Sequence, residues 1–213
     1  MPDQGRPSTG EQAKRHAFAQ LRQAILRGDM APAQRLVENE LAEQSGVTRA
    51  GIRAALIDLE AQGLVERIRN RDSRVRVVTV EEAVAITECR MALEGLCAAK
   101  TAATADDAQL DRLTELGTVM TKAVADGDPL TYSQLNQELH TRIQEFSGQR
   151  TAVALLDRIN GQLVRHRFQS ALRPGRSQHS LVEHLAMIEA IRARDPEAAV
   201  RAHLTSVIEA LRG

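Results

Sequence analysis

The sequence has few aromatic residues and no net charge. Its 213 residues include no Trp, one Tyr and three Phe, and its 28 Lys and Arg balance 28 Asp and Glu. So few aromatic side chains exclude the stacking platforms on which binders of single-stranded nucleic acid rely. A neutral chain has no general attraction to nucleic acid or to a membrane surface. Apolar residues make up 43% of the chain, which is enough for an ordinary core.

The sequence also lacks a long apolar run. No stretch approaches the roughly 20 apolar residues that a membrane-spanning helix needs, so we expect no membrane partner. Residues 1–10 lack the apolar segment of a signal peptide and contain two Pro and two Gly, which predicts a flexible tail. Cys89 and Cys97 are eight residues apart in a helical pattern. That spacing is roughly 12 Å along the axis, too far for a disulfide, and uncrosslinked thiols suit a reducing cytoplasm.

The zero net charge conceals two halves of opposite sign. Residues 11–80 carry twelve basic and nine acidic side chains, whereas residues 81–213 carry fifteen basic and eighteen acidic ones. The pattern predicts a mildly basic module joined to a mildly acidic one.

The basic half has the pattern of a winged helix-turn-helix. Helical periodicity covers residues 11–27 and 37–44 and resumes near Thr48. Apolar and charged residues then alternate over residues 64–78 on both sides of a short polar turn, which predicts a β-hairpin. We therefore expect a winged helix-turn-helix over residues 11–79, with the hairpin as its wing.

The acidic half is a succession of helices. Start signals such as Asp128-Pro129 and Asp195-Pro196 place Asp at the N-cap and Pro at the first helical position. Because the connections are short, neighbouring helices are expected to be antiparallel. The fold expected for the whole chain is therefore mainly α, with an all-α antiparallel bundle over residues 80–213. The bundle has about six helices, predicted at residues 81–103, 106–125, 129–147, 150–171, 177–194 and 196–212.

Basic side chains gather where a helix-turn-helix reads DNA. Gly46 can adopt the positive φ of the turn, and Thr48 can cap the next helix. Arg49 and Arg53 are four residues apart and project from one face near the start of that helix, where Arg can bond bidentately to guanine. The hairpin arginines are placed to contact phosphates or the minor groove. The alternative is a solvated charged helix face beside a hairpin with ordinary surface arginines.

Residues 25–56 and 59–65 resemble the DNA-binding domain of GntR-family transcription regulators, above all in Leu36-Val-Glu-Asn-Glu-Leu-Ala42 and Gly46-Val-Thr-Arg49. The resemblance implies contacts with double-stranded DNA from the helix start and from the wing tip. The predicted contact residues are Asn39, Thr48, Arg49, Arg53, Arg71, Ser73 and Arg74.

The sequence departs from the family pattern at four positions. Ala33 replaces a Gly, and Asn39 replaces an Arg but can still bond a phosphate or a base. Gly51 replaces the Pro of the recognition helix, at a cost of about 1 kcal/mol for a Gly within a helix. Arg71-Asp72-Ser73 stands where the wing tip usually has Gly.

Three histidines of the acidic half fall within predicted helices: His140, His184 and His203. Asn136 lies one helical turn before His140 and shares its face. Three imidazoles and an amide oxygen that converge from three helices can hold a divalent metal such as Zn or Ni. Helical histidines are otherwise ordinary surface or core residues.

Residues 80–213 look like the FCD effector domain of the FadR-like branch of GntR regulators. The resemblance implies an all-helical, homodimeric domain in which an Asp and three His hold a divalent metal beside a small carboxylate effector. By position the His ligands are His140, His184 and His203, and Asn136 stands at the Asp position. Without an acidic ligand the metal keeps its full charge, so we expect a carboxylate effector to complete its coordination.

Arg90 and Arg142 are predicted effector-binding residues, since Arg can clamp a carboxylate bidentately. The alternative for Arg90 is a surface arginine paired with Glu94 at i, i+4.

The sequence predicts a ligand-responsive, sequence-specific transcription regulator that binds an inverted repeat as a homodimer. One alternative is the same regulator without a functional metal site. The other is a three-His metal-dependent enzyme, but Glu138 points about 160° away from His140 on the helix, so the enzyme lacks a general base.

Overall fold

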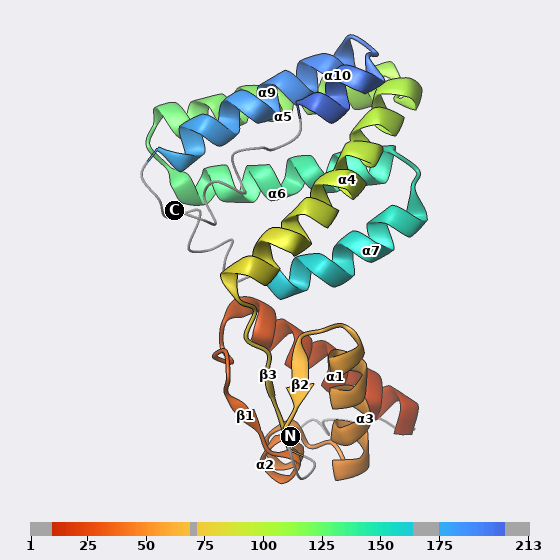
Figure 1. Ribbon diagram of the computed structural model, residues 1–213, viewed down its shortest axis with the longest axis vertical. Helices are drawn as coiled ribbons and strands as arrows, with labels where there is room; N and C mark the ends of the chain where they lie inside the picture. The colour runs from red at the N-terminus through yellow and green to blue at the C-terminus, as the bar shows by residue number, and fades with distance from the viewer. Residues whose placement is uncertain (1–9, 69–71, 164–174, 203–213) are drawn as a thin grey trace, which may run out of the picture. The chain divides into compact units, whose positions relative to one another are not determined.

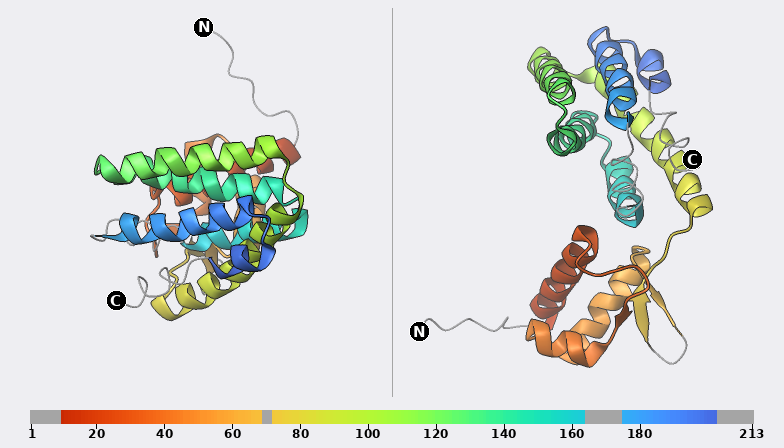
Figure 2. Two further views of the ribbon diagram at one scale, coloured as in Figure 1. Left: turned by 90° about the horizontal axis from the view of Figure 1, so that it is seen from above. Right: turned by 90° about the vertical axis from the view of Figure 1, so that its left-hand side faces the viewer.

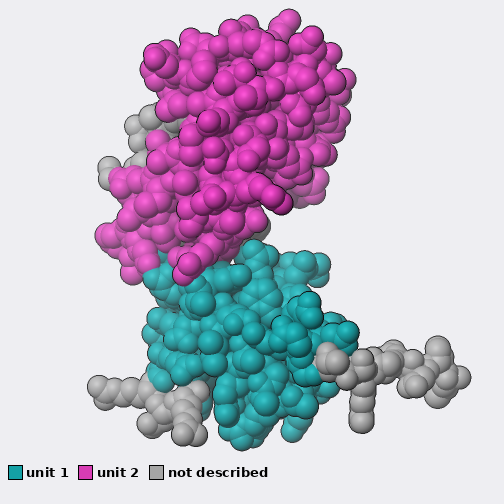
Figure 3. Space-filling view, turned by 90° about the vertical axis from the view of Figure 1, so that its right-hand side faces the viewer, with its two compact units in different colours: residues 1–78 teal, residues 79–213 magenta. Residues whose placement is uncertain are grey.

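The computed structural model describes residues 10–68, 72–163 and 175–202. The chain divides into two compact units, residues 1–78 and residues 79–213, coloured separately in Figure 3. Each unit has a hydrophobic core of its own. None of the helices in the described part of the chain is long and apolar enough to span a bilayer.

The first unit is a winged helix-turn-helix (Figure 1). Its helices are α1 (Gly10–Arg27), α2 (Glu38–Ser45) and α3 (Arg49–Ala61), and its strands are β1 (Arg35–Leu36), β2 (Val65–Arg67) and β3 (Ser73–Val75). The hairpin of β2 and β3 is the predicted wing. Strand β1 was not predicted, and it pairs with β3 to give an antiparallel sheet of order β1-β3-β2. Two residues are too short a strand to give a periodic pattern.

The turn between α2 and α3 is built as the sequence predicts. Gly46 has φ 65°, and the Oγ1 of Thr48 accepts a hydrogen bond from the backbone N–H of Gly51 at 3.2 Å. A Cβ on Gly51 would lie only 2.8 Å from Cγ1 of Val47. Glycine at position 51 therefore lets the start of α3 pack tightly against the turn, which offsets its poor helix propensity.

The second unit is all helical (Figures 1 and 2). It contains α4 (Val80–Thr104), α5 (Asp107–Ala125), α6 (Pro129–Phe146), α7 (Arg150–Asn160), the 3₁₀ turn η2 (Gly161–Leu163), α9 (Arg176–Arg192) and α10 (Pro196–Arg201). Helix α4 packs against α6, α7, α9 and α10, and α5 packs against α6 and α9. The helix predicted at 150–171 ends as an α-helix at Asn160. Residues 164–171 of that prediction, and 203–212 of the last predicted helix, lie outside the described residues.

Side-chain caps fix where these helices begin. The carboxylates of Asp106, Asp128 and Asp195 each accept a hydrogen bond from a backbone N–H in the first turn, at 2.8, 3.0 and 2.9 Å. Such caps each contribute about 1 kcal/mol. The helix starts predicted from Asp128 and Asp195 are confirmed, as is the start predicted at residue 106, and the three caps set the positions of α5, α6 and α10.

Candidate DNA-binding surface and candidate metal centre

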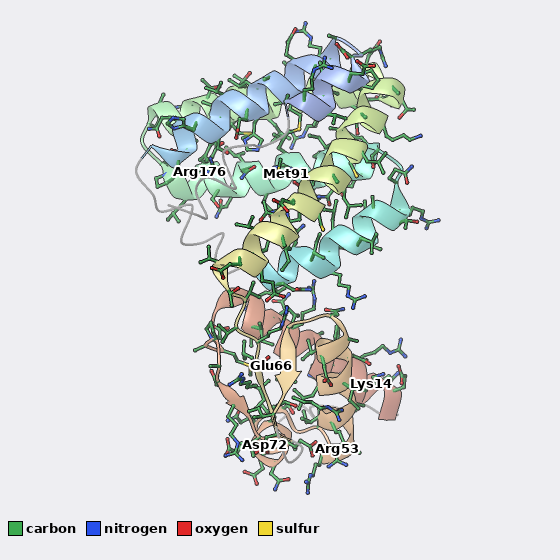
Figure 4. All side chains as sticks on the ribbon, in the orientation of Figure 1. Lys14, Arg53, Glu66, Asp72, Met91 and Arg176 are labelled. Atoms are coloured by element: carbon green, nitrogen blue, oxygen red, sulfur yellow. The ribbon has the colours of Figure 1, made fainter. Side chains whose placement is uncertain are left out.

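The start of α3 presents the predicted DNA-reading residues to solvent. Thr48, Arg49 and Asn39 are exposed, and 47% of the Arg53 side chain is accessible. Figure 4 shows Arg53 at the same end of this unit as Asp72, which belongs to the turn of the wing. Exposed arginines at a helix start beside a wing are the arrangement that enters a DNA groove.

Glu38 joins the two arginines of α3 from the start of α2. Its Oε2 accepts a hydrogen bond from Nε of Arg49 at 2.9 Å, and its two oxygens accept bonds from Nε and Nη2 of Arg53 at 2.8 and 2.7 Å. These bonds, those from Arg53 foremost, lower the pKa of Glu38 from 4.5 to about 2. Glu38 is therefore ionised throughout the physiological pH range.

The lowered pKa of Glu38 predicts a loss of stability in acid. A carboxylate with a depressed folded-state pKa stabilises the protein fully above about pH 4.5, and the contribution disappears as the pH falls towards 2. We expect the free energy of unfolding, measured by urea denaturation at several pH values, to fall across this window. The variant Glu38→Gln should show a shallower slope there. A slope identical to that of the parent chain would contradict the assignment.

The wing differs from the predicted contact set. Arg71 lies outside the described residues. Ser73 is 7% exposed and sits in β3 between two neighbouring strands, so its side chain is not displayed at the tip. Arg74 is paired with Glu66 on β2, at 2.7 Å between Nε and Oε1. Asp72, where the family pattern has Gly, is bonded by Arg35 of β1, so its charge is neutralised by a neighbouring strand.

Two of the predicted metal ligands face each other in the helical unit. The Nε2 atoms of His140, on α6, and His184, on α9, are 3.2 Å apart. His184 is only 1% exposed. Asn136 lies one turn before His140, and its Oδ1 is buried without a hydrogen-bond partner. The third predicted histidine, His203, lies outside the described residues.

The second nitrogen of His184 is held by two hydroxyl groups. Its Nδ1 lies 3.1 Å from the Tyr132 hydroxyl and 3.2 Å from Oγ of Ser180. If Nδ1–H donates to one of these oxygens, Nε2 is the nitrogen that carries the lone pair a metal would bind. Neither residue was singled out in the sequence. Ser180 precedes His184 by four residues and Tyr132 precedes Asn136 by four, so helical spacing alone could have found both.

The arrangement fits a divalent metal. Two imidazole nitrogens at about 2.1 Å from one ion lie roughly 3.0–3.4 Å apart in octahedral or tetrahedral geometry, and the two Nε2 atoms have this separation. The orphaned Oδ1 of Asn136 supplies a further buried donor atom. No three His, Cys, Asp or Glu side chains gather as a metal site among the described residues. The candidate set therefore depends on Asn136 and on His203.

Arg90 is buried, and it is not the surface arginine of the alternative interpretation. It is 8% exposed, and its Nη2 donates to Oε1 of Glu94 at 2.8 Å, while Glu94 is 4% exposed. The Nε of Arg90 is buried without a partner. The guanidinium of Arg142 is engaged by Glu138 and Glu145.

A helix-turn-helix with a wing, followed by an all-helical domain in which two imidazoles face each other, defines a DNA-binding transcription regulator. The gntR family of bacterial regulatory proteins matches residues 13–75, and the FCD domain matches residues 85–207. The chain belongs to this family of GntR regulators with an FCD domain.

Similar proteins agree with this assignment. The chain is 29% identical to the HTH-type transcriptional regulator YdhC of Bacillus subtilis, over 92% of this chain and 89% of the relative. It is 26% identical to the HTH-type transcriptional repressor NanR of Cronobacter sakazakii, over 95% and 86%. Its fold is similar to that of Escherichia coli McbR/YncC, with a TM-score of 0.71 at 20% identity over 92% of this chain and 93% of that one. The two sequence relatives are named as transcriptional regulators, and the chain is a regulator too.

Proposed function

We propose that the protein is a ligand-responsive regulator whose helical domain binds a small carboxylate beside a divalent metal. The observation that carries this proposal is the pair of facing imidazoles, buried His184 and half-buried His140, beside the orphaned amide oxygen of Asn136. A domain that served only as scaffold would gain nothing from burying an unpaired amide oxygen, which costs about 1–3 kcal/mol.

The metal is Zn, Ni or a similar ion, held by Asn136, His140, His184 and His203. When bound, it supplies a fixed positive charge for an anion. None of the four ligands is negative, so a carboxylate effector that completes the shell also offsets half of the charge of the metal. Arg90 can reach the effector through the donors that Glu94 leaves unused, which include its unpartnered Nε, or by exchanging Glu94 for the effector carboxylate.

We propose further that two copies pair and read the two half-sites of an inverted repeat. A groove of about 340 Å³ runs between α5 and α9, and its lining comprises Thr114, Gly117, Thr118, Thr121, Leu185, Ile188, Glu189 and Arg192. The hydroxyls of its three threonines donate to carbonyls of α5 itself, which leaves their methyl groups for packing. Val182, about one helical turn before Leu185 on α9, is 69% exposed.

The charges of this face are self-complementary. Glu189 and Arg192 lie one helical turn apart on α9, and neither has an ion-pair partner within the described part of the chain. If two α9 helices pack antiparallel about a two-fold axis, Glu189 of one copy lies opposite Arg192 of the other. The occupant that satisfies both charges is therefore a second copy of this chain.

Charge reversal tests this interface. Glu189→Arg or Arg192→Glu alone places like charges opposite each other, so each should raise the dimer dissociation constant at least about fivefold. The double variant should restore it. Sedimentation equilibrium measures the constant, and Glu197→Arg on α10 is the control. A double variant no better than the single ones would contradict this interface, and a monomeric parent chain would contradict the homodimer.

Selection of random DNA duplexes by the full-length chain tests the DNA-binding part of the proposal. We expect two inverted half-sites about 10 base pairs apart, or a multiple of that spacing, because each half-site occupies one face of the duplex. A single isolated half-site would contradict binding as a symmetric dimer.

A further inference from the structure

The three bonds of Glu38 leave Arg49 and Arg53 with different free donors. A guanidinium has five N–H groups: one on Nε and two on each Nη. Arg49 uses only Nε in its bond to Glu38, so both of its Nη groups stay free. Arg53 uses Nε and Nη2 together, so the edge of its guanidinium that carries Nε is closed, and three N–H groups remain on Nη1 and Nη2.

The free donors of Arg49 match a guanine edge. Guanine presents two acceptors, O6 and N7, side by side in the major groove, and Arg reads them with two parallel N–H bonds. The paired Nη groups of Arg49 offer this fork, and 62% of its side chain is exposed. The bond at Nε fixes the direction of the fork, which lowers the entropy lost on binding.

Arg53 lines a hollow that faces the wing. The hollow has a volume of about 240 Å³ and is lined by Glu38, Arg53, Leu56, Ile57, Arg67 and Ser73. Arg67 belongs to β2 and is paired through Nε with Glu60 at 2.9 Å. Two guanidiniums and a hydroxyl on the rim of one hollow offer the donors that a phosphate oxygen accepts. Ser73 is 7% exposed, and the hollow is where its side chain lines an open space.

Glu38 does not repel a phosphate from this hollow. Its charge is shared between two guanidiniums, so the trio of Glu38, Arg49 and Arg53 keeps a net charge of +1. The low pKa of Glu38 keeps this arrangement unchanged through the physiological range.

We propose that Glu38 is a positioning residue that gives the two arginines separate tasks. Arg49 reads a guanine in each half-site, and Arg53 holds a backbone phosphate together with Arg67 and Ser73. This inference rests on the sequence-specific DNA binding proposed above. The inference adds that Arg49 carries the preference for a base of the DNA, because Glu38 holds its guanidinium in place.

Selection of random duplexes by full-length variants, followed by titration of the selected duplex and of a random one, tests the division of tasks. Arg49→Ala should reduce the guanine preference at one position of each half-site from about 5–150-fold to none, with little change for the random duplex. Arg53→Ala and Ser73→Ala should each weaken binding to the selected duplex and to the random duplex by the same factor. Arg53→Ala should also reduce the salt slope by about 1 per half-site.

The variant Glu38→Gln tests whether Glu38 acts by positioning the two arginines or only through its negative charge. It frees both arginines, so the guanine preference should fall about fivefold or more while binding to the random duplex holds or strengthens. Glu40→Gln, on the same helix, removes an equal charge from an exposed side chain and should keep the preference. Thermal melting of each variant checks that the domain stays folded.

The outcomes distinguish a failure of this inference from a failure of the sequence-specific DNA binding on which it rests. A parent chain that selects no sequence overturns specific DNA binding itself. If the parent chain selects a sequence, two results would overturn the division of tasks. One is an Arg49→Ala variant that keeps the guanine preference, and the other is an Arg53→Ala variant that loses a base preference. Equal profiles for Glu38→Gln and Glu40→Gln overturn the role of Glu38.

Discussion

Replacing Glu94 by Ala is expected to lower the free energy of unfolding by about 3–5 kcal/mol, because it leaves the guanidinium of Arg90 charged and unpaired in the core. Both side chains are nearly inaccessible, and the bond between them is 2.8 Å long. Urea denaturation of the full chain measures the loss. Arg90→Ala should lower the free energy of unfolding by a similar amount, since it leaves the Glu94 carboxylate charged and unpaired in the core.

A matched pair on the surface provides the control for this prediction. Glu197 and Arg201 have the same i, i+4 spacing on α10, but their side chains are 87% and 67% exposed. Arg201→Ala should therefore cost less than about 1 kcal/mol. The double variant Arg90→Met/Glu94→Leu removes both charges and should recover most of the stability. A Glu94→Ala variant as stable as Arg201→Ala would contradict the burial of this ion pair.

Replacing His184 by Ala is expected to weaken the binding of a divalent metal by about 100-fold or more, because it removes a ligand rather than a residue that orients one. Titration of the metal-free full chain with Zn or Ni measures the affinity. His179→Ala is the matched control, since His179 lies on the same helix but is exposed and bonds the carbonyl of Gly175. Equal losses in both variants would contradict the site.

A substitution at Asn136 should strengthen metal binding, whereas His184→Ala weakens it. Asn136→Asp supplies the missing negative ligand, so the metal affinity should rise by about tenfold or more, and the dependence on an added carboxylate should fall. A parent chain that binds neither Zn nor Ni, with an Asn136→Asp variant that binds neither, would leave the regulator without a metal and favour effector binding through Arg90 alone.

The parts of the fold that could be predicted are those fixed by local chemistry. Asp106, Asp128 and Asp195 mark helix starts because a carboxylate satisfies N–H groups only a few residues away. Strand β1 escaped prediction because its pairing with β3 depends on residues far along the chain. The end of α7 at Asn160 was also missed, although Gly161 directly after it is a helix stop signal.

In the candidate sites too, residue types could be predicted from the sequence, whereas contacts between helices could not. His140 and His184 could be named from their residue type and family position, but their facing Nε2 atoms depend on how α6 and α9 pack. The bonds of Glu38 to Arg49 and Arg53 span eleven and fifteen residues and join two helices. No pattern along the chain gives such a contact, so the role of Glu38 became visible only in the structure.

The central claim is that a ligand in the helical domain controls DNA binding. The measurement that tests it is the dissociation constant of the full-length protein for its selected duplex, with Zn or Ni present, before and after addition of a small carboxylate shown to bind by thermal shift. We expect the constant to change by about 5–150-fold, the usual range of such coupling, and to stay constant in the His184→Ala variant. An unchanged constant in the parent chain, with the carboxylate bound, would contradict the account.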